Sequence, residues 1–176
     1  NIFKKLNFLR FYNLFSLNEK IIKQKIFLNK YVQEITVFKN YPDTLEIRIK
    51  KAEILAITSI DGIKYYIASN GNLIKQYQND YKNLPYIFGE IDVQEFLNFK
   101  EIIDTSDFKF QDIKKLYFYP SRRWDIETSK GVLIKLSNFN IKESLNQFSK
   151  LFNDMNFQNL TYFDFRQNNQ MIINGR

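Results

Sequence analysis

The chain has 176 residues, of which 44% are apolar and 17% aromatic, so it can build a packed core and is not intrinsically disordered. It contains no cysteine and no histidine, which excludes disulfides, thiolate metal sites, cysteine nucleophiles and a Ser-His-Asp triad. The net charge of +7 lies entirely in residues 1–51, which hold eleven Lys/Arg and four Asp/Glu, whereas residues 52–176 hold fifteen of each. This asymmetry predicts two modules. The basic first one suits nucleic acid or anionic lipid, unless it is simply a solvated lysine-rich surface.

The first third of the chain predicts two helices followed by a hairpin. Apolar residues alternate with basic ones over 2–15, which indicates a short amphipathic helix. Ser16 or Asn18 can cap a second helix, NEKIIKQKIFLNK. The stretch 35–51, ITVFKNYPDTLEIRIKK, is typical of two strands joined by the turn 40–43. One face of the second strand, expected to pack on the helices, carries Leu45, Ile47 and Ile49.

The remainder of the chain is mainly β in pattern, with two helices. Helices are expected over 92–104, capped by Asp92, and over 140–155. The segment 83–90, NLPYIFGE, is expected to be a loop because of its proline and glycine. Strands are expected around the Asn70-Gly71 turn, over 113–121, on both sides of the turn 129–131, and over 160–166 and 170–174.

No motif carries catalysis or binds a cofactor. Ser106 and Lys109 have the spacing of a serine–lysine pair but lie in a polar loop without any accompanying motif. Asp104, Asp107 and Asp112 fit no calcium loop, and there is no Walker or GxGxxG motif. We therefore expect no enzyme, no cofactor and no metal site, and interpret the chain as an interaction module.

Four segments, in a fixed order, resemble the extracytoplasmic region of the FtsQ/DivIB family, which are bitopic bacterial division proteins. They are VFKNYPDTLEIRIKKAEILAI, GIKYYIASNGNLI, LPYIFGE, and RRWDIETSKGVLIKL followed by a helix and YFDFR. The chain departs from the family pattern at Ala68-Ser69-Asn70, where an acidic turn is usual, and at Lys51-Ala52-Glu53. The resemblance implies an α+β fold: a small POTRA domain, helices on a short sheet, over residues 1–51, and a mostly antiparallel β domain with two flanking helices over residues 52–176.

The resemblance also implies a function and a place in the cell. We expect a non-enzymatic divisome scaffold that binds the small bitopic proteins FtsB and FtsL through its β domain and supports septum assembly. The POTRA domain, apparently lacking its first strand here, is expected to face the inner membrane and to contact other division proteins. A transmembrane helix before residue 1 would place this region in the periplasm. Two alternatives remain at this point: a POTRA-bearing module of an outer-membrane assembly or transport system, and a nucleic-acid-binding protein.

The expected partner contact lies on the last strand, within residues 166–173, which would be the edge of a sheet. Alternation places Met171 and Ile173 on one face of that strand and Ile172 on the other. Trp124 and Phe165 are expected in the core. The predicted partner-binding residues are Arg122, Arg123, Arg166, Gln167, Met171, Ile172 and Ile173, with the first two suited to pairing with a partner carboxylate.

Overall fold

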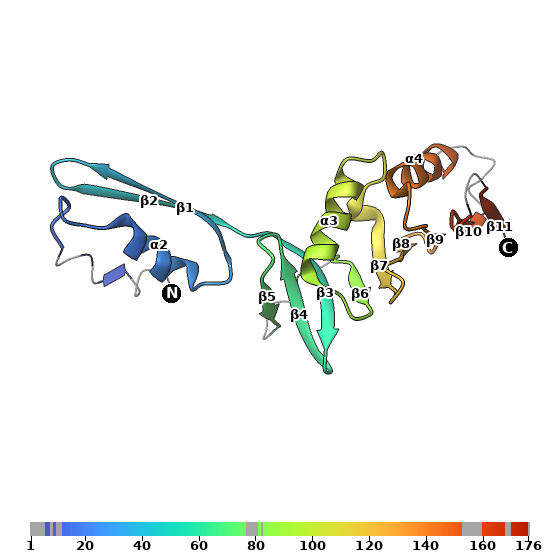
Figure 1. The fold of residues 1–176 in the computed structure, drawn as a ribbon, viewed down its shortest axis with the longest axis horizontal. Helices are drawn as coiled ribbons and strands as arrows, with labels where there is room; N and C mark the ends of the chain where they lie inside the picture. Colours follow the sequence, from blue (N-terminus) through green and yellow to red (C-terminus); the bar gives the residue numbers. More distant parts are fainter. Residues whose placement is uncertain are drawn as a thin grey trace.

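The structure, a computed structural model, describes residues 6–7, 9, 12–76, 81, 83–152, 160–167 and 170–175. These residues form two modules arranged end to end, so that the molecule is elongated (Figure 1). A two-stranded sheet belongs to the first module and a nine-stranded sheet to the second. The α+β class expected from the sequence is confirmed.

The first module packs a helix against a hairpin. Helix α2 (Glu19–Phe27) begins at Asn18, whose side chain accepts a hydrogen bond from the backbone N–H of Lys20 at 2.9 Å. Strands β1 (Val32–Asn40) and β2 (Thr44–Lys51) pair antiparallel, with one irregularity in the register between Val32 and Glu34. The predicted second helix and the hairpin are confirmed, while the predicted helix over 2–15 falls mostly outside the described residues. The small core that joins helix and hairpin contains Leu17, Ile22, Ile26, Val32, Ile35 and Val37, with Leu45, Ile47 and Ile49 packed against it.

The second module is one sheet covered by two helices on one face. Its helices are α3 (Val93–Asp104), capped by Asp92 as predicted, and α4 (Ile141–Phe152), with a short 3-10 turn η2 (Phe110–Asp112) between them. The strand order is β11-β10-β9-β8-β7-β6-β3-β4-β5, and most neighbouring pairs are antiparallel. The strands are β3 (Ile54–Ile60), β4 (Ile63–Ala68), β5 (Leu73–Lys75), β6 (Tyr86–Phe88), β7 (Ile113–Phe118), β8 (Trp124–Thr128), β9 (Leu133–Lys135), β10 (Leu160–Asp164) and β11 (Ile172–Gly175).

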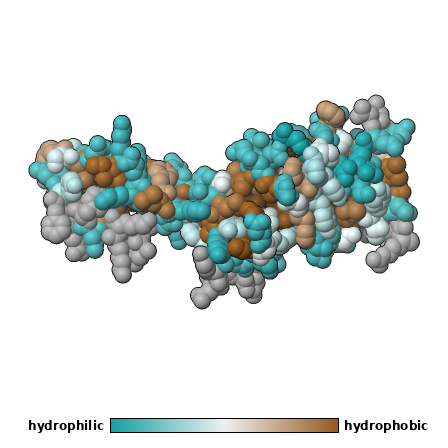
Figure 2. Space-filling view, turned by 60° about the horizontal axis from the view of Figure 1, so that its bottom comes forward, coloured by the Kyte–Doolittle hydropathy of each residue, from teal (hydrophilic) through white to brown (hydrophobic). Residues whose placement is uncertain are grey.

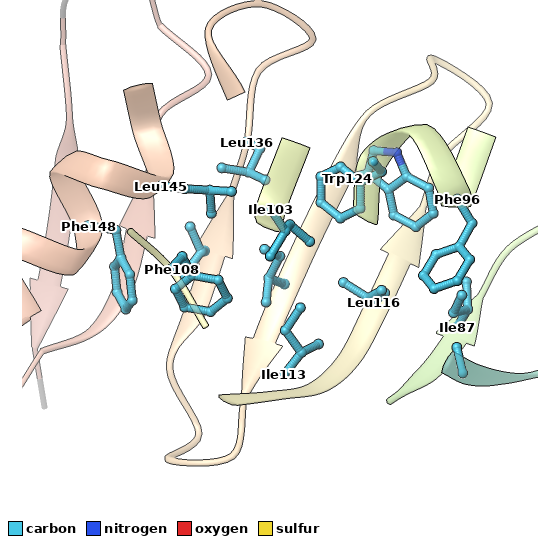
Figure 3. Close-up of a cluster of buried hydrophobic side chains, with 14 of the residues drawn as sticks. Ile87, Phe96, Ile103, Phe108, Ile113, Leu116, Trp124, Leu136, Leu145 and Phe148 are labelled. Atoms are coloured by element: carbon cyan, nitrogen blue, oxygen red, sulfur yellow. The ribbon is translucent and has the colours of Figure 1, made fainter. Parts of the chain in front are cut away.

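The main core lies between the sheet and the two helices (Figure 3). Trp124 stacks on Phe99 of α3 with ring centroids 4.5 Å apart, and Phe148 of α4 meets Phe163 of β10 edge to face. Trp124 and Phe165 are both buried, as expected. The face of the sheet away from α3 and α4 is called the open face below.

Two strands of the sheet were not foreseen. Strand β3 forms a hairpin with β4 through Asp61 and Gly62, which have φ angles of 50° and 76°, as a two-residue hairpin turn requires. The segment predicted to be a loop contains β6, which pairs parallel with β3 on one side and β7 on the other. The loop prediction for 86–88 is therefore wrong, because parallel partners distant in sequence supply the hydrogen bonds that stabilise so short a strand.

The two modules meet at a hydrogen-bonded junction. Strand β2 continues through Ala52, whose backbone N–H donates to the carbonyl of Tyr31 at 2.9 Å. The Asn70 side chain donates to the carbonyls of Lys30 and Val32 at 3.0 and 2.8 Å. The Ser69 hydroxyl donates to the Gln33 side chain at 3.0 Å. The turn that departs from the acidic family pattern therefore holds the second module to the first.

Candidate functional site

The last strand of the chain, β11, lies at one end of the large sheet. It pairs antiparallel with β10, with Ile172 opposite Asp164 and Ile173 opposite Phe163. Within the described residues no strand pairs with its outer side, so the N–H and C=O groups on that side face outward. Its sequence, Ile-Ile-Asn-Gly, has neither the lysine nor the proline that often protects an edge strand. The strand is thus an open edge that another extended segment can extend.

A row of core side chains crosses the sheet and reaches this edge. The strand register aligns Thr58, Ile87, Leu116, Ile126, Ile134, Phe163 and Ile173. All are buried except Ile173, which is 39% exposed. Hydrophobic residues also reach the surface at the β11 end of the molecule in Figure 2. A further strand beside β11 would bury Ile173 and lengthen the core by one residue.

The two residues before Ile173, Met171 and Ile172, point to opposite faces of the sheet. Ile172, 47% exposed, lies in the row of the open face that includes Asp164 and Lys135. Met171 is half-buried and packs against the main core. Gln167 is exposed in the turn between the last two strands, where its carbonyl accepts a hydrogen bond from the backbone N–H of Gln170 at 3.3 Å.

The turn between β7 and β8 separates the two predicted arginines. Arg122 has a φ angle of 59° and forms an ion pair with Glu95 of α3, on the helix-covered side. Arg123 lies on the open face, where its Nε donates to Asp125 at 3.2 Å and its guanidinium lies 4.2 Å from the ring centroid of Tyr119. The two side chains therefore cannot form a single fork around one partner carboxylate in this conformation.

Arg166 is held at the end of β10 by a buried carboxylate. Its Nε donates to both oxygens of Asp164, at 2.8 and 2.9 Å, and the Tyr162 hydroxyl donates to the same group at 2.8 Å. The hydrogen bonds from the Arg166 side chain hold the pKa of Asp164 well below its ordinary value, against the effect of burial. This cluster fixes the direction in which the chain leaves β10.

A second buried carboxylate lies two strands away on the same face. The register aligns Asp125 with Lys135 and, on the next strand, with Asp164. Burial raises the pKa of Asp125, although the charge of Arg123 acts in the opposite direction. The open face next to β11 thus carries Arg123, Asp125, Lys135, Asp164 and Arg166, with one more positive than negative formal charge.

The opposite end of the large sheet is covered. Strand β5 lies there, but the Lys30 side chain of the first module donates to the carbonyl of Leu73 at 3.0 Å. Asn72, just before this strand, donates to the carbonyl of Lys30 at 3.4 Å. Of the two ends of this sheet, the β11 end is therefore the one that the described part of the chain leaves open.

The described residues contain no group of three or more acidic side chains placed to hold a metal ion. Asp104, one of the three aspartates noted in the sequence, forms an ion pair with Lys100 at 2.5 Å. No helix in the described ranges is both long and apolar enough to cross a bilayer.

Residues 56–166 match the family described as "Cell division protein FtsQ/DivIB, C-terminal", and residues 2–52 match "POTRA domain, FtsQ-type". The chain belongs to the FtsQ/DivIB family. Members of this family are cell division proteins. The match over the second module also separates the chain from POTRA-bearing outer-membrane systems, which was one of the two alternatives.

The chain is also similar in sequence to individual FtsQ and DivIB proteins. FtsQ from Rickettsia bellii is 26% identical over 191 residues, which cover 98% of this chain and 65% of that protein. FtsQ from Rickettsia prowazekii is also 26% identical, with the same coverage. DivIB from Clostridium botulinum (strain Loch Maree) is 33% identical over 75 residues, covering 43% of this chain and 29% of that protein. The chain therefore spans less than two thirds of the length of these relatives.

Among solved structures, the major extracytoplasmic domain of DivIB from Geobacillus stearothermophilus is similar, with a TM-score of 0.44 and 12% identity. The match covers 61% of this chain and 96% of that domain.

Sequence reasoning did not find the role of Asp164 or the separation of the two arginines. The first was visible in principle, because Tyr162, Asp164 and Arg166 alternate along a strand and therefore share a face. The second depends on the positive φ angle of Arg122, for which the sequence carries no clear signal.

Proposed function

We propose that this chain is the periplasmic part of a non-enzymatic divisome scaffold, anchored in the inner membrane by a single transmembrane helix upstream of residue 1. Residues 1–51 form its POTRA domain, completed by a strand from that upstream segment, and contact other division proteins. Residues 52–176 form the β domain that binds the small bitopic partners FtsB and FtsL at the septum. Family membership and the end-to-end arrangement of the two modules support this assignment.

Strand β11 is the proposed contact for these partners, by addition of an extended partner segment to the sheet. The observation that carries this proposal is the core row that ends at the half-exposed Ile173. Backbone hydrogen bonds to the open edge supply affinity, and burial of Ile173 and Ile172 against alternating partner side chains supplies specificity. A partner strand of three or four residues is enough to cover β11.

The charged side chains beside this edge form the rim of the proposed contact. Arg166 and Gln167 lie at the entry to the last turn, and Arg123 lies on the same open face as Ile172. Met171 supports the edge from the core side. Arg122, 76% exposed on the other side of the sheet, is reached only by a partner that also contacts α3.

Proline scanning of β11 tests the edge directly. In an antiparallel pair, successive residues direct their N–H groups alternately to the neighbouring strand and away from it. Of Ile172→Pro and Ile173→Pro, one variant therefore loses a bond to β10 and the other loses only an outward N–H. The variant that keeps its urea unfolding midpoint should bind extracytoplasmic FtsB and FtsL peptides about tenfold more weakly, measured by titration calorimetry.

A matched control is available at the other end of the sheet, where Leu73→Pro changes the strand that the first module covers. This variant should leave peptide affinity unchanged as long as the second module remains folded. Saturable binding that both β11 variants leave intact would show that the partners bind elsewhere.

A further inference from the structure

The first module combines a positive charge with exposed aromatic side chains. It holds the whole net charge of the chain, +7 over residues 1–51. Single exposed apolar side chains are common on soluble proteins, but exposed apolar side chains that gather together mark an interaction site. Figure 2 shows hydrophobic residues reaching the surface of this module beside hydrophilic ones.

One exposed aromatic pair lies where the hairpin turn meets the start of α2. Phe15 and Tyr41 stack with ring centroids 4.7 Å apart, yet they remain 68% and 57% exposed. The Lys39 side chain donates to the carbonyl of Leu17 at 2.6 Å and holds the hairpin against the segment that precedes α2. The pair is thus fixed in position by the fold without being covered by it.

A second group of exposed apolar residues follows the outer side of α2. Its buried face is formed by Ile22 and Ile26. Ile21 and Leu28, seven residues apart and therefore on one side of the helix, are 38% and 76% exposed. Three lysines lie on the helix, Lys20, Lys23 and Lys25, of which Lys23 also forms an exposed ion pair with Glu19 at 3.8 Å.

We propose that this surface binds the anionic lipid headgroups of a membrane. Aromatic side chains at one end, exposed aliphatic side chains along a short helix and lysines beside them are the features of a segment that lies in the membrane interface. The lysines attract the negatively charged surface, and Phe15, Tyr41 and Leu28 enter the boundary between headgroups and acyl chains. This basic surface lies in the first module and binds lipid, whereas the β11 edge lies in the second module and binds an extended protein segment.

Charge and side-chain type favour lipid over the other polyanion. A nucleic-acid surface needs a continuous run of phosphate contacts and places aromatic rings flat against bases. Here Phe15 and Tyr41 stack on each other, and acidic side chains at Glu34 and Glu46 interrupt the basic residues of the hairpin. Exposed isoleucine and leucine contribute nothing to base stacking but do enter a lipid interface.

Vesicle sedimentation with the 176-residue chain tests the proposal. The probes are phosphatidylcholine vesicles with and without about one third phosphatidylglycerol. We expect binding to the anionic vesicles only, weakened about tenfold or more by Lys20→Gln combined with Lys25→Gln. Phe15→Ser should also weaken binding, whereas Phe139→Ser, an aromatic residue that is 73% exposed in the second module, should not. The charge control is Lys64→Gln combined with Lys142→Gln.

Fluorescence gives an independent readout, because the single tryptophan, Trp124, is buried in the second module. Brominated lipids should quench the tryptophan fluorescence of the Phe15→Trp variant. In the Phe139→Trp variant, the fraction of fluorescence that is quenched should be no larger than in the unmodified chain. The proposal is overturned if anionic vesicles do not bind at about 0.15 M salt. Equal losses in the control variants, or a dimer in solution that Phe15→Ser disrupts without any vesicle binding, would also overturn it. None of these outcomes affects the β11 contact, since the assay contains no division partner.

Discussion

Two aspartates on the open face occupy similar positions but differ in their effect on stability. Asp164 accepts hydrogen bonds from Arg166, Tyr162 and a backbone N–H, and its pKa is lowered. Asp125 is equally buried but has weaker compensation, and its pKa is raised. A lowered pKa means that folding favours the charged form, and a raised pKa means that folding disfavours it.

Asp164→Asn should therefore destabilise the fold by about 2 kcal/mol at pH 7, because the Arg166 and Tyr162 donors lose a charged acceptor. The stabilisation by Asp164 is present above its unfolded pKa of about 4 and is lost as the pH falls. Urea unfolding should consequently show a smaller difference between wild type and variant at about pH 3.

Asp125→Asn is the matched comparison, for which we expect no loss of stability at pH 7. Its raised pKa means that ionisation costs stability as the pH rises through the folded value. The variant should be as stable as wild type or more stable by up to about 1 kcal/mol at pH 7, again by urea unfolding. A loss as large as that of Asp164→Asn would contradict the assigned directions.

At the scale of elements, the short strand β6 depends on a glycine. Gly89 follows the strand with a φ angle of 107°, and a Cβ atom there would overlap the backbone carbonyl of Phe118 on β7. The glycine in the motif LPYIFGE thus permits close approach of two parallel strands. The proline and glycine of this segment predict a loop, but the segment contains a strand followed by a glycine in close contact with β7.

Gly89→Ala should destabilise the protein by about 3 kcal/mol, since it adds a steric overlap to an unfavourable backbone conformation. Gly131→Ala is the control: its φ angle is 82°, but a Cβ atom there would have no neighbour within 4 Å. That variant should lose only about 1 kcal/mol. The free energy of unfolding of both variants can be measured by chemical denaturation. Equal losses of stability would contradict the explanation.

At the scale of the whole molecule, the junction fixes how the two modules are oriented. Asn70 satisfies two carbonyls of the first module, and Tyr31 of the first module lies near Tyr66 and Tyr81 of the second. Burial, and then the proximity of those two tyrosines, raises the pKa of Tyr31. In this arrangement the β11 edge lies at the end of the molecule that is far from the first module (Figure 1).

Asn70→Ala should loosen this arrangement, because the carbonyl of Val32 loses the Asn70 donor and that of Lys30 keeps only the longer hydrogen bond from Asn72. Small-angle X-ray scattering should show a broader distribution of distances, while each module remains folded by circular dichroism. Asn98→Ala is the control, as this side chain bonds within α3 to Gln94 at 2.9 Å. Identical scattering curves for wild type and Asn70→Ala would show that strand continuity alone orients the modules.

Much of the fold could be predicted because its determinants are local. Apolar periodicity and the caps Asn18 and Asp92 fix the helices, and alternation with an Asn-Gly turn fixes β4 and β5. Strand β3 was also predictable from its Asp-Gly turn, and it was missed. Strand β6 was not, because its hydrogen bonds come from partners about thirty residues away on either side.

The sequence by itself determined the class, the family resemblance, the charged first module and the apolar alternation of residues 171–173. Only the tertiary structure decided that β11 ends the sheet with Ile173 half-exposed, that Arg122 and Arg123 face opposite sides, and that Asn70 joins the modules. The physical reason is range. Helix caps, turns and alternation act between residues close in sequence, whereas strand order, burial and ion pairing depend on which distant segments meet.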